Sequence, residues 1–349
     1  MNDLDKLIEL VIKEGASDLH ISEERVPYIR VSGQLIPLVK VEKFTKVIME
    51  SIVNKVLSDV KKTSFKENQS ADLSYSHKGD RFRAHIFVDQ QRLCMTLRRI
   101  PKKIPSLNEL NLPSELENFT RLKSGFFLVV GPTGHGKSTT LASMIEKINT
   151  ERLENIITIE DPIEYMFEAK KSIIHQREVG MDTPSFASAL HDSFRADVNV
   201  IMVGEMRDTD TISTAVSAAE TGHLVFSTLH TNNASQTVDR IIDSFTAGQQ
   251  SQVRVQLASS LSGIFSQRLI PRISGGLIPA YELLVNNIAV SNLIRDKRTH
   301  ELNTMIETGS QEGMIDFNRC LVEKVNKGEI TIENAYLYSN NPRALEKML

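Results

Sequence analysis

Hydrophobic residues recur at helical spacing at the start of the chain and then alternate with polar ones. Residues 4–14 place apolar side chains on one face of a predicted helix, at Leu4, Leu7, Ile8, Val11 and Ile12. The segment 16–21 predicts a short strand, and 28–36 alternates around Gly33 as a β-hairpin does. A helix is expected near 44–60, followed by strands near 71–76, 81–88 and 92–99. The pattern predicts a small α+β module of about 100 residues.

The pattern changes after a stretch that contains Pro101, Pro105 and Pro113, so we predict a linker over 101–120. Beyond it, continuous apolar runs predict strands that are buried on both faces, over 126–130, 156–159, 200–203 and 224–227. Helical patterns separate these runs, which is typical of a mainly parallel sheet with helices on both faces. From about residue 250 we expect mostly helix.

The composition is that of a globular protein and excludes some functions. Among 349 residues, 41 Lys and Arg face 44 Asp and Glu, and the net charge of −3 is not that of a protein that coats nucleic acid. No apolar run approaches the roughly 20 residues of a spanning helix, and the acidic start is unlike a signal peptide. We expect a cytoplasmic protein. Cys94 and Cys320 form neither a zinc nor a disulfide pattern.

A glycine-rich turn follows the first buried strand and precedes an amphipathic helix. Its residues fit the phosphate-binding pattern G-x-x-x-x-G-K-[ST] and run Gly131, Pro132, Thr133, Gly134, His135, Gly136, Lys137, Ser138, with Thr139 next. Backbone N–H groups and the helix N-terminus bind phosphates in such a loop. We expect Lys137 to reach the β- and γ-phosphates of ATP and Ser138 to hold Mg²⁺. This is the Walker A segment.

Two acidic segments follow later strands, where folds of this kind bind ligands. Residues 158–165 carry the carboxylates of Glu160, Asp161 and Glu164, which either orient water or metal or form a solvated acidic loop. Residues 200–208 deliver Glu205 at a strand end. Glu205 is a candidate to bind Mg²⁺ through water or to act as general base. The alternative for Glu205 is a solvated acid.

A third segment, 221–231, places His223 and His230 at the two ends of one short strand. His230, at the carboxyl end, is a candidate to sense the γ-phosphate. His223 is equally well explained as a capped core histidine.

Together with the opening Ala16-Ser17-Asp18-Leu19-His20-Ile21, these segments resemble the secretion-ATPase superfamily that powers type IV pili and type II secretion. In that family they are the Walker A segment, the Asp box (158–165), the Walker B segment (204–208) and the His box (221–231). The chain is most similar to the pilus retraction ATPases of the PilT family. The resemblance implies a PAS-like domain over 1–100 and a RecA-like ATPase domain with C-terminal helices over 121–349. It also implies a hexameric ring, Glu205 as the catalytic glutamate, and Glu164 as a group that positions metal or water.

The resemblance further implies that arginines of the N-terminal domain act on the nucleotide. The matching positions are Arg81, Arg83 and Arg98. An arginine can neutralise charge on the transferred phosphoryl group. The alternative is that these strand arginines only face solvent.

Two features favour retraction over assembly or secretion. The relatives in those branches usually have a further N-terminal domain and often a four-cysteine zinc motif, which this chain lacks. Residues 289–297 also resemble the C-terminal AIRNLIRE motif of the retraction branch, with departures at Val290, Ser291 and Asp296. The alternative is a plain amphipathic helix.

Two histidines depart from the family pattern. His135 stands where serine is usual in Walker A, and His191 replaces an arginine in the stretch before Walker B. We expect the phosphate loop to tolerate His135. The change at His191 puts subunit contacts and turnover in question.

The leading interpretation is a hexameric ATP-driven motor for pilus retraction and twitching motility. ATP binding and hydrolysis would rotate the two domains about the linker. The partners would be a platform protein of the inner membrane and a second retraction or assembly ATPase, without nucleic acid. The alternatives are an assembly or type II secretion ATPase, a regulator that binds ATP but hydrolyses it poorly, and a nucleic-acid translocase, against which the net charge counts.

Overall fold

The computed structural model describes residues 3–31 and 33–349 and contains two compact units. The first unit holds the chain up to Lys103 together with Glu160–Met166 and Arg177–Ser185. The second holds Ile104–Ile159, Phe167–Gln176 and Phe186–Leu349. The chain therefore passes between the units five times, after residues 103, 159, 166, 176 and 185. Within the described ranges, no helix is both long and apolar enough to cross a bilayer.

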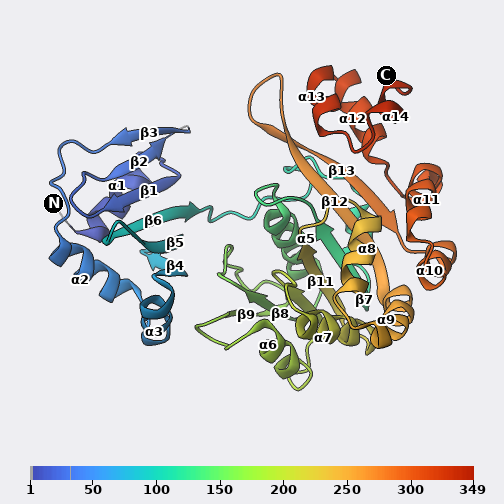
Figure 1. Cartoon of the computed structure of the whole chain (residues 1–349), viewed down its shortest axis with the longest axis horizontal. Helices are drawn as coiled ribbons and strands as arrows, with labels where there is room; N and C mark the ends of the chain where they lie inside the picture. The colour runs from blue at the N-terminus through green and yellow to red at the C-terminus, as the bar shows by residue number, and fades with distance from the viewer. Residues whose placement is uncertain (1–2, 32) are drawn as a thin grey trace. The chain divides into compact units, whose positions relative to one another are not determined.

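The first unit is an antiparallel sheet with helices packed on one face (Figure 1). The six strands lie in the order β3-β2-β1-β6-β5-β4. Their bounds are β1 Asp18–Ser22, β2 Tyr28–Val31, β3 Gln34–Pro37, β4 Ser70–His77, β5 Asp80–Asp89 and β6 Arg92–Ile100. The helices are α1 Leu4–Lys13, α2 Lys46–Val56 and α3 Asp59–Asn68. Of the hairpin predicted over 28–36, Ser32 lies outside the described residues.

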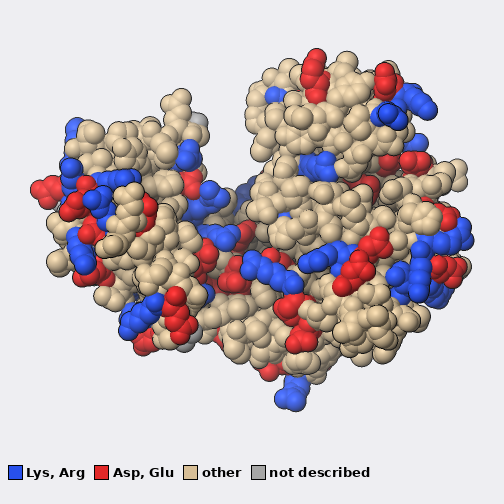
Figure 2. Space-filling model, in the orientation of Figure 1, with Lys and Arg blue, Asp and Glu red and all other residues tan. Residues whose placement is uncertain are grey.

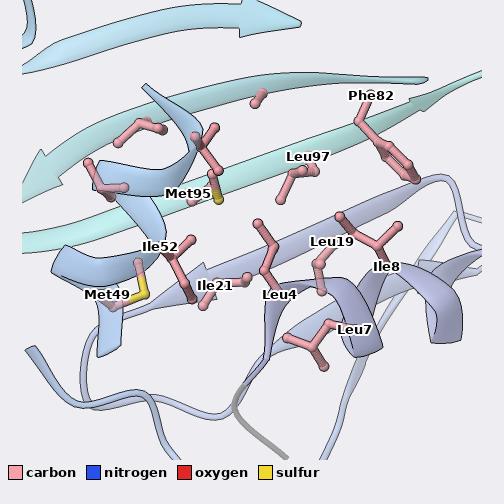
Figure 3. Close-up of a cluster of buried hydrophobic side chains, with 14 of the residues drawn as sticks. Leu4, Leu7, Ile8, Leu19, Ile21, Met49, Ile52, Phe82, Met95 and Leu97 are labelled. Atoms are coloured by element: carbon pink, nitrogen blue, oxygen red, sulfur yellow. The ribbon is translucent and has the colours of Figure 1, made fainter. Parts of the chain in front are cut away.

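The core of this unit forms where the apolar face of α1 meets the sheet (Figure 3). Leu4 and Ile8 of α1 pack with Leu19 of β1 and Phe82 of β5, and none of these side chains is more than 1% exposed. The helical spacing of the first residues produces this face, because residues three and four apart share one side of a helix. The helix predicted over 4–14 is confirmed.

The alternation of β5 divides its side chains between two environments. Phe82, Ala84 and Ile86 are buried in the core, so the side chains of Arg81 and Arg83 lie on the opposite face. This face of the sheet contacts the loop segments 160–166 and 177–185 of the same unit.

The helix predicted over 44–60 is wrong in extent, because the segment forms two helices. The first, α2, ends at Val56, and Leu57 adopts an extended backbone. Ser58 then begins α3 as its N-cap and accepts a hydrogen bond from the N–H of Lys61 at 3.3 Å. A serine at this position favours a new helix start because its hydroxyl satisfies a backbone N–H that has no partner within the helix.

The second unit is built on a seven-stranded sheet in the order β13-β12-β7-β11-β10-β8-β9. Its strands are β7 Gly125–Val130, β8 Asn155–Glu160, β9 Ile173–Glu178, β10 Val200–Val203, β11 Leu224–Leu229, β12 Leu261–Pro271 and β13 Leu277–Val285. Neighbours from β12 to β8 are parallel, and β13 is antiparallel to β12. Every residue of β7, β10 and β11 is buried, as the continuous apolar runs predict.

Helices connect and cover this sheet, and a group of short helices packs beyond β13 (Figure 1). The connecting helices are α5 Lys137–Glu151, α6 Phe186–Ser193, α7 Thr209–Glu220, α8 Ala234–Asp243 and α9 Ala247–Ser260. The C-terminal helices are α10 Ile288–Arg295, α11 Leu302–Thr308, α12 Phe317–Asn326, α13 Ile332–Tyr338 and α14 Pro342–Glu346. The predicted class, an α+β domain followed by a RecA-like α/β domain with a helical C-terminal part, is confirmed.

The prediction of mostly helix from about residue 250 is wrong for 261–285, which form β12 and β13. Residues 261–271 form a strand because their backbone pairs with β7, which lies far earlier in the chain. A short apolar run does not by itself distinguish a buried strand from a buried helix. Only the pairing with β7 and β13 settles the conformation.

Residues 104–120 pack within the second unit. Leu107, Leu112, Leu116 and Phe119 are buried in its core, the last two within the short helix α4, Leu116–Thr120. On the surface, acidic and basic side chains are interspersed in small groups over the face shown in Figure 2.

A carboxyl group is buried beneath the start of α8. The side chain of Glu282, on β13, accepts a hydrogen bond from the N–H of Ala234 at 2.9 Å. Burial raises the pKa of Glu282 to about 7, although this N–H favours the ionised form. The folded protein therefore holds a proton on Glu282 more tightly than the unfolded chain does. The contribution of protonated Glu282 to the free energy of unfolding is complete below the unfolded pKa of 4.5. It is lost as pH rises through about 7.

We expect Glu282→Gln to remove this loss, because glutamine cannot ionise and its amide oxygen still accepts from Ala234. At pH 8 the variant should be more stable than the wild type by about 1–3 kcal/mol, and at pH 5 the two should be similar. Thermal unfolding at both pH values measures the difference. The exposed Glu307→Gln is the control, and its pH dependence should match the wild type. An equal effect of Glu282→Gln at pH 5 and pH 8 would contradict this account.

Candidate functional site

The predicted phosphate loop connects β7 to α5 and depends on glycines at two close approaches. Gly131 follows β7 with φ +143°, and a Cβ placed there would lie 2.3 Å from the carbonyl oxygen of Gln267 on β12. Gly136, at φ +82°, begins α5 and forms no side-chain cap. Only glycine combines these backbone angles with this close contact. The first turn of α5 thus presents backbone N–H groups that no cap side chain occupies, as phosphate binding requires.

The side chain of Lys137 folds back over the loop. Its Nζ donates to the carbonyl oxygens of Gly131 at 2.8 Å and Pro132 at 3.0 Å, and the residue is 7% exposed. The Nζ is also 3.3 Å from Nδ1 of His230. These contacts hold the ammonium group at the mouth of the loop, where it could bind a phosphate oxygen.

Gln267 of the neighbouring strand β12 forms hydrogen bonds that support the loop. Its amide Nε2 donates to the carbonyl of His135 at 2.6 Å, and its Oε1 accepts from the Thr140 hydroxyl at 2.7 Å. Gln267 is 2% exposed, so both polar ends of the amide are satisfied inside the protein. It ties the loop and the first turn of α5 to the neighbouring strand.

His135 is turned toward the same strand. Its Nδ1 accepts a hydrogen bond from the N–H of Leu269 at 2.9 Å, which assigns the proton of the neutral ring to Nε2. Burial, together with the charges of Arg268 and Lys137, lowers the pKa of His135. The histidine at this unusual position is therefore held neutral and serves to pack the loop against β12.

Glu205 and His230 complete a connected line of polar groups in the second unit. Nε2 of His230 is 3.4 Å from Oε2 of Glu205, whose other oxygen pairs with Arg207 at 2.5 Å. The ammonium of Lys137 can only donate, so Nδ1 of His230 accepts and Nε2–H faces Glu205. His230 thus links the Walker A lysine to the Walker B glutamate.

Three other polar residues in or near these segments make structural contacts. Asp208 is the N-cap of α7 and accepts from the N–H of Thr211 at 2.8 Å. Nδ1 of His223 lies 3.0 Å from the carbonyl of Ala218 at the end of α7, and its ring packs edge-on against Phe194. His191, on α6, also packs beside Phe194. For His223 the structure shows the capping role, which was the alternative left open.

Among the described residues, no group of three or more His, Cys, Asp or Glu side chains could hold a metal ion. Mg²⁺ commonly binds through one or two protein oxygens together with substrate phosphates. The exposed hydroxyl of Ser138 and the carboxylate of Glu205 fit that role.

The remaining predicted residues lie in the first unit. NH1 of Arg83 approaches Oε1 of Glu164 at 3.5 Å. Arg98 pairs with the buried Asp18 at 2.8 Å. Arg81 binds Glu178 at 3.1 Å, a partner that no sequence motif indicates. The structure therefore brings Arg83 together with Glu164, and engages Arg81 and Arg98 with other carboxylates.

The sheet is mainly parallel, has a Walker A loop after β7, and has an acid, Glu205, just beyond the end of β10, which lies two strands from β7. These features define a RecA-like P-loop nucleotide-hydrolysing fold. The sequence model of the Type II/IV secretion system protein family matches residues 1–276. The chain belongs to this family, and the predicted class of secretion-superfamily ATPase is confirmed.

Three relatives show where in the family the chain lies. The type IV pilus retraction ATPase PilT of Pseudomonas aeruginosa is 40% identical over 334 residues, which cover 95% of this chain and 97% of that one. A twitching motility protein of Neisseria gonorrhoeae is also 40% identical, over 91% of this chain and 86% of its own. The crystal structure of the pilus retraction motor PilT with bound ADP superimposes with a TM-score of 0.91 at 44% identity, over 99% of both chains.

We expect Gln267→Ala to loosen the phosphate loop, because the hydroxyl of Thr140 and the carbonyl of His135 lose their partner. The free energy of unfolding should fall by about 1–3 kcal/mol, and ADP affinity should fall roughly tenfold. Thermal unfolding and equilibrium binding of ADP measure the two effects. Gln249→Ala is the control, because Gln249 is exposed and bonds only locally to Thr246. Unchanged ADP affinity in Gln267→Ala would show that this support is not needed for binding.

Proposed function

We propose that this chain hydrolyses ATP and uses the free energy to retract type IV pili. The observation that carries the hydrolysis is the connected line from Lys137 through His230 to Glu205, set beside a phosphate loop. The retraction activity rests on the relatives, since two of them are named for pilus retraction and one for twitching motility.

In this proposal the chain's groups divide the work of phosphoryl transfer. The loop N–H groups and Lys137 bind the phosphates, and Ser138 holds the Mg²⁺ that accompanies ATP. Glu205 accepts a proton from the water that attacks the γ-phosphorus, as the bond to the β-phosphate oxygen breaks and ADP leaves. His230 contacts both Lys137 and Glu205, so its position changes when Lys137 moves to bind the γ-phosphate, and Glu205 is affected through it.

The first unit contributes Glu164 and the arginines Arg81, Arg83 and Arg98. We propose that Glu164 positions metal or water and that an arginine neutralises charge on the transferred phosphoryl group. ATP binding and hydrolysis then rotate one unit against the other. We place the hinge at the five crossings of the chain rather than throughout 101–120, because residues 107–119 are packed in the second unit's core.

The assembly follows the retraction family. We propose a homohexameric ring in the cytoplasm that acts on a platform protein of the inner membrane, alongside a second retraction or assembly ATPase. A ring formed by head-to-tail contacts lets each rotation move a neighbouring subunit.

We expect Glu205→Gln to lower the rate of ATP hydrolysis at least about a hundredfold while ADP binding is retained, because the amide cannot accept the proton. Lys137→Ala should lose binding as well as turnover. Phosphate release and ADP titration measure the two quantities, and the exposed Glu307→Gln is the matched control. Equal turnover in Glu205→Gln and the wild type would remove the catalytic assignment. Wild-type turnover no faster than Lys137→Ala would mean a nucleotide-binding regulator.

Deleting the gene in its host should give cells with excess pili and no twitching motility, because assembly then proceeds without retraction. Pili are counted by electron microscopy, and motility is scored on agar. Complementation with the wild-type gene should restore both, whereas Glu205→Gln should restore neither. Cells without pili would point instead to an assembly motor, and unaltered pili with a secretion defect would point to a type II secretion ATPase.

A further inference from the structure

Most of the Asp box, residues 160–165, is carried by the first unit, although the box begins within β8 of the second unit's sheet. Residues 160–166 begin at the end of β8, residues 177–185 begin with the last two residues of β9, and both segments pack in the first unit. At the centre of their contacts lies Glu178, the last residue of β9, whose side chain is 3% exposed. None of the nucleotide-binding motifs includes this residue.

Four donors converge on the carboxylate of Glu178. Its Oε1 accepts from the N–H of Ser74 at 3.3 Å. Its Oε2 accepts from the Ser74 hydroxyl at 2.5 Å, from NH2 of Arg81 at 3.1 Å and from the N–H of Ile163 at 3.2 Å. A buried carboxylate with this many donors, one of them a guanidinium, has a well-defined position.

Arg81 also binds Ile163, at its carbonyl oxygen rather than at its N–H. Its Nε donates to the carbonyl of Ile163 at 3.2 Å, while its NH2 reaches both Glu178 and the Ser74 hydroxyl. The N–H and the C=O of Ile163 are therefore fixed by a carboxylate and a guanidinium that are themselves paired. Arg81 therefore makes its contacts around Ile163 in this structure.

The next residue is Glu164, the candidate that positions metal or water. Its carboxylate is 32% exposed and meets Arg83 at 3.5 Å, and its N–H lies 3.4 Å from Oε2 of Glu160. These contacts are longer than those at Ile163. The direction of the Glu164 side chain therefore depends mainly on the backbone that Glu178 and Arg81 hold.

We propose that Glu178 is a positioning residue for ATP hydrolysis: with Arg81 and Ser74 it fixes Ile163, and thereby keeps Glu164 beside Arg83 on the first unit. The inference rests on the proposed ATPase function. Glu178 itself touches no reacting group. It acts by orienting Glu164, because small misplacements of a catalytic group strongly reduce rate.

The direct test is Glu178→Gln in the full-length protein. Glutamine keeps the size of the side chain, but it loses the charge and turns N–H groups toward donors. We expect kcat for ATP hydrolysis to fall about tenfold or more while KM for ATP stays within about twofold, since the phosphate loop is untouched. The matched control is Asp80→Asn, because Asp80 is likewise buried in the first unit and pairs with Arg99 at 2.9 Å. An unchanged kcat in Glu178→Gln, or a loss no larger than that of Asp80→Asn, overturns the inference.

A second measurement separates positioning from general loss of structure. If Glu178 acts through Glu164, the double variant Glu164→Gln/Glu178→Gln should be no more than about twofold slower than Glu164→Gln alone. If the two substitutions lower kcat by factors that multiply in the double variant, the proposal is overturned. Ser74→Ala removes one contact to Glu178 without removing a charge, and supplies the same comparison if Glu178→Gln fails to fold. We expect it to lower kcat less than Glu178→Gln, again without further effect in the Glu164→Gln background.

The outcomes for the two proposals are distinguishable. Wild-type turnover no faster than Lys137→Ala would remove the ATPase function itself. Brisk wild-type turnover with an unaffected Glu178→Gln would leave that function standing and remove only the role of Glu178.

Discussion

The phosphate loop depends on how closely β7 and β12 approach each other. A Cβ at position 131 would lie 2.3 Å from the carbonyl oxygen of Gln267, so only glycine fits at this point of the loop. The same residue uses its side-chain amide to hold the loop carbonyl at His135 and the hydroxyl of Thr140. One residue of β12 thus fixes the loop at its start, at its middle and in the first turn of α5. The orientation of Lys137 and the backbone N–H groups follows from that support.

The histidine at position 135 is explained by the same contact. A serine at this place offers a small hydroxyl, whereas His135 extends to the backbone of β12 and accepts from Leu269. Because the nearby charges of Arg268 and Lys137 add to the effect of burial, the ring stays neutral and adds no positive charge near the loop. The departure from the family pattern therefore strengthens the attachment of the loop to the sheet.

The sequence predicts the parts of this site that are local in the chain. The glycine pattern, the buried strand before it and the helix after it lie within one stretch, so the loop and Lys137 could be predicted directly. Gln267 could not, because its role arises from the pairing of β12 with β7, and 261–285 were expected to be helical. The alternation of β5 predicts that Arg81 and Arg83 share a face. It gives no indication that Glu178, almost 100 residues later, is the partner of Arg81.

The division of polar groups between the two units constrains how the molecule can work as a motor. Lys137, His230 and Glu205 belong to one unit, whereas Glu164 and Arg83 belong to the other. The chain crosses from the second unit to the first after Ile159, within the Asp box, so a shift of one unit against the other must bend the chain there as well as after Lys103. The pair of Arg81 and Glu178 resists bending within the loops themselves, because parting it would separate two opposite charges that lie largely out of solvent. In the proposed mechanism the bending is therefore placed at the crossings, and Glu164 belongs to the first unit together with its contacts to Arg83.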